Sequence, residues 1–104
     1  MGKNRETALL LRELRVESGR SLRKAASELG VAPSHLSRLE RGEKSPGSDL
    51  RRRAANYYGV HSDVLELAEG RVPPDILRIL QAHPELLDAL RRKYAQVTEY
   101  PELP

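Results

Sequence analysis

The residues from Pro33 to Arg41 combine hydrogen-bonding and basic side chains with only two large aliphatic residues, Leu36 and Leu39. These leucines are three positions apart, so a helix over this segment would place them on one face and its polar residues on the others. A guanidinium such as that of Arg38 can donate two hydrogen bonds to the O6 and N7 atoms of guanine in the major groove of duplex DNA. The segment is therefore a candidate for reading base edges.

Five residues of this segment are candidate base-contacting residues: Pro33, Ser34, His35, Ser37 and Arg38. The start of a helix docked in the major groove makes most of its base-edge contacts, and a proline there can touch a thymine methyl group. A structural interpretation stays open for each polar member of the set. Ser34 could cap a helix, His35 and Arg38 could be solvated, and Ser37 could turn inward beside the leucines.

Basic side chains are concentrated around this segment. Residues 20–53 contain nine Lys and Arg against four Asp and Glu, whereas residues 71–104 contain five of each. A local excess of positive charge attracts the phosphates of nucleic acid. The candidate phosphate-contacting residues are Arg20, Ser21, Arg23, Arg41 and Lys44. For each of the charged residues, and for the run 51–53, a solvated surface charge remains the alternative.

A second short helix is predicted immediately before the candidate segment. Apolar residues in 22–29 recur at the spacing of one buried helical stripe, and Ser21 is suited to cap its start. Gly30 can adopt the left-handed backbone conformation that ends a helix abruptly, and Pro33 is preset for the start of the next one. The pattern thus predicts a helix, a sharp turn and a second helix.

Three further stretches extend this pattern: Leu11-Arg12-Glu13-Leu14-Arg15 through Gly19, Leu36-Ser37-Arg38-Leu39-Glu40-Arg41-Gly42, and Gly59-Val60. Together with residues 21–30 they resemble the helix-turn-helix domain of the phage-repressor and Cro type, the XRE-like family, over residues 5–69. The resemblance implies duplex DNA as the partner and a partly buried structural ion pair between Arg15 and Glu40. The sequence departs from the family at Leu22, where a polar residue that contacts phosphate is common, and at Ala25, where leucine is usual.

We expect an all-α fold: a five-helix repressor-type helix-turn-helix domain followed by a short two-helix C-terminal extension. The domain is assigned to residues 1–70 and the extension to residues 71–104. Helices are expected over residues 5–17, 22–29, 33–41, 49–58 and 62–69. Ser48 is expected to cap the fourth helix, residues 71–74 to form a stiff connector, and two further helices to meet at His83-Pro84.

The extension carries helical apolar stripes, of which four residues are candidates for dimerisation: Leu86, Leu87, Leu90 and Tyr94. Such a stripe can pair across a two-fold axis. The alternative is that it packs back on the first and fifth helices of its own chain. The extension is therefore a candidate segment for dimerisation or for binding a protein partner.

Composition argues against several other classes of protein. The chain has no Cys, which excludes disulfides and Cys-ligated zinc, and its three His show no metal-ligand spacing. No phosphate-binding loop or nucleophile motif is present, so we expect neither an enzyme nor a cofactor or metal site. The longest apolar run, residues 8–11, is too short for a signal peptide or a membrane span, which predicts a cytoplasmic protein without a membrane partner.

These observations favour a sequence-specific double-stranded DNA-binding transcriptional regulator. We expect a repressor that binds an inverted-repeat operator as a homodimer, because one small domain reads too few base pairs to select a site. The alternative is a helical protein-interaction adaptor or antitoxin-like module whose DNA-binding role is secondary. Stable co-purification with another protein, without binding to duplex DNA, would favour that alternative.

Overall fold

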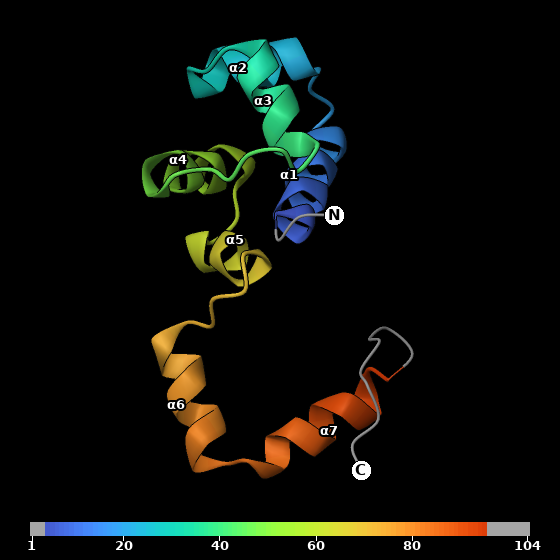
Figure 1. Cartoon of the computed structure of the whole chain (residues 1–104), viewed down its shortest axis with the longest axis vertical. Helices are drawn as coiled ribbons and strands as arrows, with labels where there is room; N and C mark the ends of the chain where they lie inside the picture. The colour runs from blue at the N-terminus through green and yellow to red at the C-terminus, as the bar shows by residue number, and fades with distance from the viewer. Residues whose placement is uncertain (1–3, 96–104) are drawn as a thin grey trace. The chain divides into compact units, whose positions relative to one another are not determined.

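The computed structural model describes residues 4–95, which are helical throughout apart from their turns and contain no strand (Figure 1). This confirms the expected all-α fold. Each of the first five helices begins and ends within one residue of its expected bounds. They are α1 (Arg5–Glu17), α2 (Leu22–Leu29), α3 (Pro33–Glu40), α4 (Ser48–Tyr58), α5 (Ser62–Ala68), α6 (Pro74–Ala82) and α7 (Glu85–Lys93).

The chain divides into two compact units, Met1–Val72 and Pro73–Pro104. In the first, α1 to α5 pack around one core of leucine and alanine side chains, in which Leu39 and Leu65 are almost fully buried. Alanines on α2 and α4 let these helices approach closely, since Ala25, Ala26 and Ala55 are 0–2% exposed. The core thus holds α2 and α3 against α1 and α4.

Local capping explains where α2 and α4 start. The Ser21 hydroxyl accepts a hydrogen bond of 3.1 Å from the backbone N–H of Lys24, as the sequence predicts. The prediction for Ser48 is wrong, because α4 begins at Ser48 itself and Gly47 occupies the cap position without a side-chain bond. The extended backbone that a helix cap needs falls on Gly47, with φ −73° and ψ 172°.

The connector before α6 is also shorter than expected. Pro74 is the first residue of α6 and not part of the connector, and Pro73 precedes it as the capping residue. Proline suits a first helical position because the backbone N–H it lacks would have no partner there.

A buried carboxylate joins α4 to the end of α5. Glu69, whose side chain is 8% exposed, accepts hydrogen bonds of 3.1 Å from both Nε and Nη2 of Arg51 and a bond of 2.7 Å from Arg71. Burial alone would raise the pKa of Glu69, but these bonds from two guanidinium groups outweigh it and lower the pKa below its ordinary value. Glu69 therefore carries a negative charge that stabilises the packing of α4 on α5.

This network predicts a stability difference that depends on pH. We expect Glu69→Gln to lower the free energy of unfolding by about 2 kcal/mol at pH 7, because a neutral amide replaces the carboxylate that accepts from Arg51 and Arg71. The lowered pKa means that the contribution of Glu69 is present above the ordinary carboxyl pKa and is lost as the pH falls through the folded-state value. Thermal melts at pH 7 and pH 3 should show the two proteins converging in acid, and an equal difference at both pH values would contradict this role.

The described part of the second unit contains α6 and α7, and neither helix has a buried residue. The helix pairs that pack extensively against each other all lie in the first unit. As for membranes, no helix within residues 4–95 has both the length and the apolar character needed to cross a bilayer.

Candidate nucleic-acid interface

The turn between α2 and α3 is built around Gly30. Its backbone is left-handed, with φ 79° and ψ 31°, and its N–H and that of Val31 bond to carbonyls in the last turn of α2. Glycine is suited to this conformation because it has no Cβ to clash with the backbone. After the turn, Ala32 is extended and Pro33 opens α3. The chain therefore changes direction within three residues.

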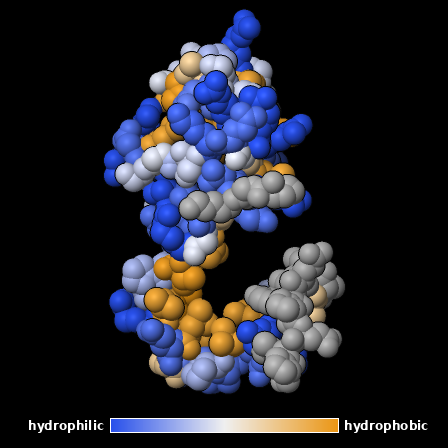
Figure 2. Space-filling model, viewed as in Figure 1, coloured by the Kyte–Doolittle hydropathy of each residue, from blue (hydrophilic) through white to orange (hydrophobic). Residues whose placement is uncertain are grey.

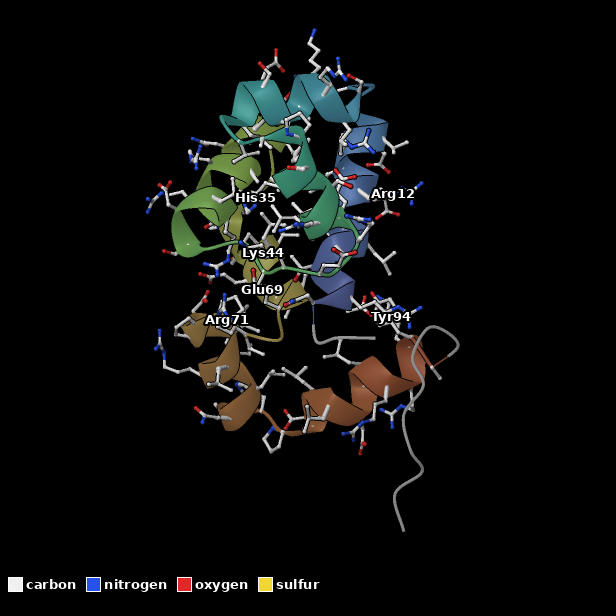
Figure 3. All side chains as sticks on the ribbon, turned by 45° about the horizontal axis from the view of Figure 1, so that its top comes forward. Arg12, His35, Lys44, Glu69, Arg71 and Tyr94 are labelled. Carbon is white, nitrogen blue, oxygen red and sulfur yellow. The ribbon has the colours of Figure 1, made fainter. Side chains whose placement is uncertain are left out.

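Helix α3 is anchored by the two leucines and otherwise faces outward. Leu36 and Leu39 are each 2% exposed, whereas Pro33, Ser34 and Arg38 are exposed. The remaining two candidates for base contacts, His35 and Ser37, are half-buried. Figure 3 locates His35 on this helix and Lys44 in the loop that follows it. The helix thus presents a polar surface along most of its length.

Four basic side chains around α3 have no hydrogen-bond or ion-pair partner among the described residues. They are Arg23 and Lys24 on α2, Arg38 on α3 and Lys44 in the following loop, and all four are exposed. An unpaired surface cation can exchange its counterions for phosphate oxygens without breaking an internal bond. These four side chains are the freest to contact a nucleic acid.

The other candidate phosphate contacts are already engaged within the chain. Nε of Arg20 lies 3.6 Å from a carboxylate oxygen of Glu28, and its guanidinium stacks over the ring of Tyr57 at 4.4 Å from the centroid. Arg41 donates to the carbonyl of Ser37 and lies 3.5 Å from Glu43, both partners of that ion pair being largely exposed. The Ser21 hydroxyl serves as the α2 cap described above.

Arg15 and Glu40, the residues expected to form a structural pair, join α1 to the end of α3. Arg15 donates from Nε to Glu40 Oε2 at 2.8 Å and from Nη2 to Oε1 at 3.1 Å, and its Nη1 donates to the Arg20 carbonyl at 3.0 Å. Their side chains are only 15% and 6% exposed. The bonds to Glu40 raise the pKa of Arg15, so the guanidinium stays charged. One side chain thus fixes both the end of α3 and the approach to α2.

Tyr58 lies next to this pair and stays uncharged. Burial, followed by the negative charge of Glu40, raises the pKa of Tyr58 to about 12. Its ring meets that of Tyr57 edge to face at 4.9 Å between centroids. Tyr58 therefore adds no negative charge beside Arg15 and Glu40.

Helix α4 supplies positioning contacts that sequence reasoning missed. Arg53 Nη1 donates to the carbonyl of Leu29 at the end of α2, and the Tyr57 hydroxyl donates to the carboxylate of Glu28. Both contacts hold the residues just before the turn at Gly30. The partners are 24 and 29 positions apart, and no local pattern in the sequence links them.

The sequence leaves open that the arginines at 51–53 form one solvated face. The structure shows instead that they differ in their partners. Arg51 is paired with Glu69, while Arg52 and Arg53 bond to Asp49 at 3.2 and 3.0 Å. Each of the three therefore has a carboxylate partner within the domain.

Helix α3 exposes its polar side, follows a left-handed glycine turn after α2, and is anchored in a core formed by five helices. This arrangement defines a helix-turn-helix DNA-binding domain. A family model described as "Helix-turn-helix domain" matches residues 6–68, and the chain belongs to this family. Such a domain is a regulator-type domain that binds DNA, which favours a transcriptional regulator over an enzyme.

The structure is also similar to two crystal structures of the clp gene regulator ClgR from Corynebacterium glutamicum. One is 27% identical with a TM-score of 0.59, covering 67% of this chain and 91% of that chain. The other is 23% identical with a TM-score of 0.60, covering 90% of this chain and 96% of that chain, and it supports the fold alone. Among curated proteins, no significant sequence match was found.

Proposed function

We propose that the protein binds a specific duplex DNA sequence with α3 in the major groove and represses transcription from that site. The observation that carries the proposal is the exposure of Ser34 and Arg38 on a helix whose two leucines are buried. Arg38 has no partner among the described residues, so its guanidinium is available to a guanine. The likeness to a gene regulator that is 27% identical supports a regulatory role.

The proposed contacts divide by the group they touch. Base edges are assigned to the exposed side chains near the start and centre of α3, namely Pro33, Ser34 and Arg38, with His35 and Ser37 at their margins. Phosphates are assigned first to Arg23 and Lys44, which are unpaired, and then to Ser21, Arg20 and Arg41. Using Arg20 in this way requires it to leave or share its contacts with Glu28 and Tyr57. Phosphate contacts orient the domain on DNA, and base contacts select the sequence.

The proposed assembly on DNA is a homodimer on an inverted repeat. A single α3 spans a few base pairs, which selects poorly against competing sites in a genome. Two copies related by a two-fold axis would place their α3 helices about 34 Å apart, in successive major grooves on one side of the duplex. A dimer seated there excludes other proteins from the same stretch of DNA, which is the physical basis proposed for repression.

The test is a selection of bound duplexes from a random-sequence pool, followed by binding assays at several salt concentrations. We expect a two-fold symmetric consensus, and an affinity that falls with salt at a log–log slope of about −0.9 per phosphate neutralised. A reporter gene carrying the consensus in its promoter should then be expressed less when the protein is present. A flat salt response, or a pool without enrichment, would contradict DNA binding, and increased reporter expression would contradict repression.

The protein-interaction alternative has one observation in its favour, the exposed apolar side chains of α6 and α7. If it is correct, the protein co-purifies with a second protein in a fixed ratio and does not shift duplex DNA. The selection experiment separates the two functions, because an adaptor would enrich no sequence.

A further inference from the structure

The last residue of α2 has a carbonyl that the helix itself cannot satisfy. In a longer helix the carbonyl of Leu29 would accept from the N–H four residues later, but that residue is Pro33, which has no N–H. Arg53 on α4 takes its place, because its Nη1 donates to this carbonyl. A Cβ on Gly30 would lie 3.4 Å from the same Nη1, so the guanidinium lies directly against the turn. A side chain from another helix therefore holds the point at which the chain changes direction.

A carboxylate on α4 aims the guanidinium of Arg53 at this carbonyl. Asp49 lies four residues before Arg53, in the first turn of α4, and accepts from its Nε at 3.0 Å. Residues four apart lie on the same face of a helix, so this bond forms along the surface of α4. The planar guanidinium is thus held at two of its nitrogens, by Asp49 at Nε and by Leu29 at Nη1. Its orientation is fixed from both sides.

Tyr57 holds the neighbouring residue of α2 from the same face of α4. It lies four residues after Arg53, and its hydroxyl donates to the carboxylate of Glu28. Asp49, Arg53 and Tyr57 therefore form one polar stripe along α4. Through this stripe, α4 contacts both of the last two residues of α2.

Apolar packing anchors the end of α2 from its inner side but does not fill its outer edge. A hollow of about 520 Å³ lies open to solvent between the end of α2 and α4, and it is lined by Glu28, Leu29, Gly30, Arg53, Asn56 and Tyr57. On the face shown in Figure 2, the first unit presents mainly hydrophilic side chains. The polar bonds from α4 are therefore the contacts that fix the turn at this edge.

We propose that Arg53, aimed by Asp49, determines DNA specificity without touching the DNA, because it fixes the direction of α3 through the carbonyl of Leu29. A base-edge contact needs about 2.7–3.2 Å between donor and acceptor and a nearly straight bond, so a small tilt of α3 weakens the contacts of Arg38 and its neighbours. A turn that is fixed before binding also loses less conformational entropy on the duplex. The long side chains that contact phosphates can follow such a tilt. This role rests on the proposed function and names the residue that positions its reading helix.

The test compares Arg53→Ala with Arg52→Ala in the full-length protein. Fluorescence anisotropy measures binding to the selected duplex and to a duplex changed at one base pair, at a temperature where circular dichroism shows both variants folded. We expect Arg53→Ala to lose about tenfold in discrimination between the duplexes while its salt slope stays unchanged. Arg52→Ala removes the same charge and a bond to the same Asp49 from a side chain that is 73% exposed, and it should discriminate as the natural protein does.

A second variant separates positioning from charge. Asp49→Ala removes the carboxylate that aims Arg53, and it also makes the protein more positive by one charge. The added charge should strengthen binding to the changed duplex, while discrimination should fall by about threefold. Discrimination that stays at the natural value would overturn the role of Asp49.

Three results would overturn the role of Arg53. Equal losses on both duplexes, with a salt slope reduced by about 0.9, would make Arg53 a phosphate contact. Unchanged discrimination with a lower melting temperature would make it a residue that only stabilises the fold. An equal loss of discrimination in Arg52→Ala would assign the effect to charge and not to the bond with Leu29.

Amide hydrogen exchange tests the positioning contact without DNA. The N–H groups of Gly30 and Val31 bond to carbonyls in the last turn of α2, and we expect both to exchange about tenfold faster in Arg53→Ala and at the natural rate in Arg52→Ala. Unchanged exchange in a protein that reads DNA would overturn the positioning role and leave the proposed function intact. A natural protein that selects no duplex would overturn the proposed function, and the role of Arg53 in reading DNA with it, while faster exchange would still show that Arg53 holds the turn.

Discussion

Replacing Glu40 with alanine is expected to lower the free energy of unfolding by about 3 kcal/mol or more, because the guanidinium of Arg15 is left buried without its carboxylate. Arg15 is 15% exposed and makes both of its side-chain ion-pair bonds to Glu40. Water can therefore restore little of the lost interaction. Chemical denaturation of the full-length protein, followed by circular dichroism, measures the change.

The matched control is Glu43→Ala, which removes an acidic residue three positions later. Glu43 and its partner Arg41 are 52% and 59% exposed, so we expect a change within about 0.5 kcal/mol. The double variant Arg15→Ala/Glu40→Ala should lose less stability than the sum of the single variants, because no unpaired charge remains. Unchanged unfolding of both single variants would show that the pair does not stabilise the end of α3.

The features that the sequence predicts well are those set by neighbouring residues. The cap at Ser21 and the turn at Gly30 each depend on a few consecutive residues, and both are where the pattern places them. The spacing of Leu36 and Leu39 likewise determines which side of α3 is buried. Helix periodicity and capping are local properties, so a single sequence is enough to find them.

The features that the sequence does not predict join distant segments. Consecutive helical residues point about 100° apart, so the arginines at 51, 52 and 53 leave α4 in different directions. Arg51 reaches Glu69, whereas Arg53 reaches the carbonyl of Leu29. Arginines that are consecutive in the sequence therefore make different contacts in the folded domain. The same holds for the hydroxyl of Tyr57, whose partner Glu28 is defined only once α2 and α4 are packed.

The joint between α6 and α7 shows an intermediate case. His83-Pro84 correctly predicts where two helices meet, but not how their apolar faces pack. Helix α6 ends at Ala82 and α7 begins at Glu85, so His83 and Pro84 both lie between them, and Pro84 is the capping residue of α7. The local pattern thus locates the joint, whereas the packing of the apolar stripes depends on contacts that no local pattern specifies.

The second large effect concerns DNA recognition. We expect Arg38→Ala to weaken binding to the selected duplex by about 1–3 kcal/mol, roughly 5- to 150-fold, if its guanidinium bonds two acceptors of one guanine. The exposed Arg12 on α1 (Figure 3) provides the control, because Arg12→Ala removes the same charge away from α3. Fluorescence anisotropy with the selected duplex and with a duplex changed at one base pair measures both affinity and specificity.

Substitution with lysine separates the charge of Arg38 from its geometry. Lysine keeps the positive charge but lacks the planar pair of donors that matches guanine, so Arg38→Lys should lose discrimination between the two duplexes while its salt slope stays unchanged. Arg23→Ala should show the opposite pattern, a uniform loss of affinity and a slope reduced by about 0.9, because a phosphate contact carries no sequence information. If Arg38→Ala instead behaves like Arg23→Ala on both duplexes, Arg38 contacts the backbone and base reading falls to the residues nearer the start of α3.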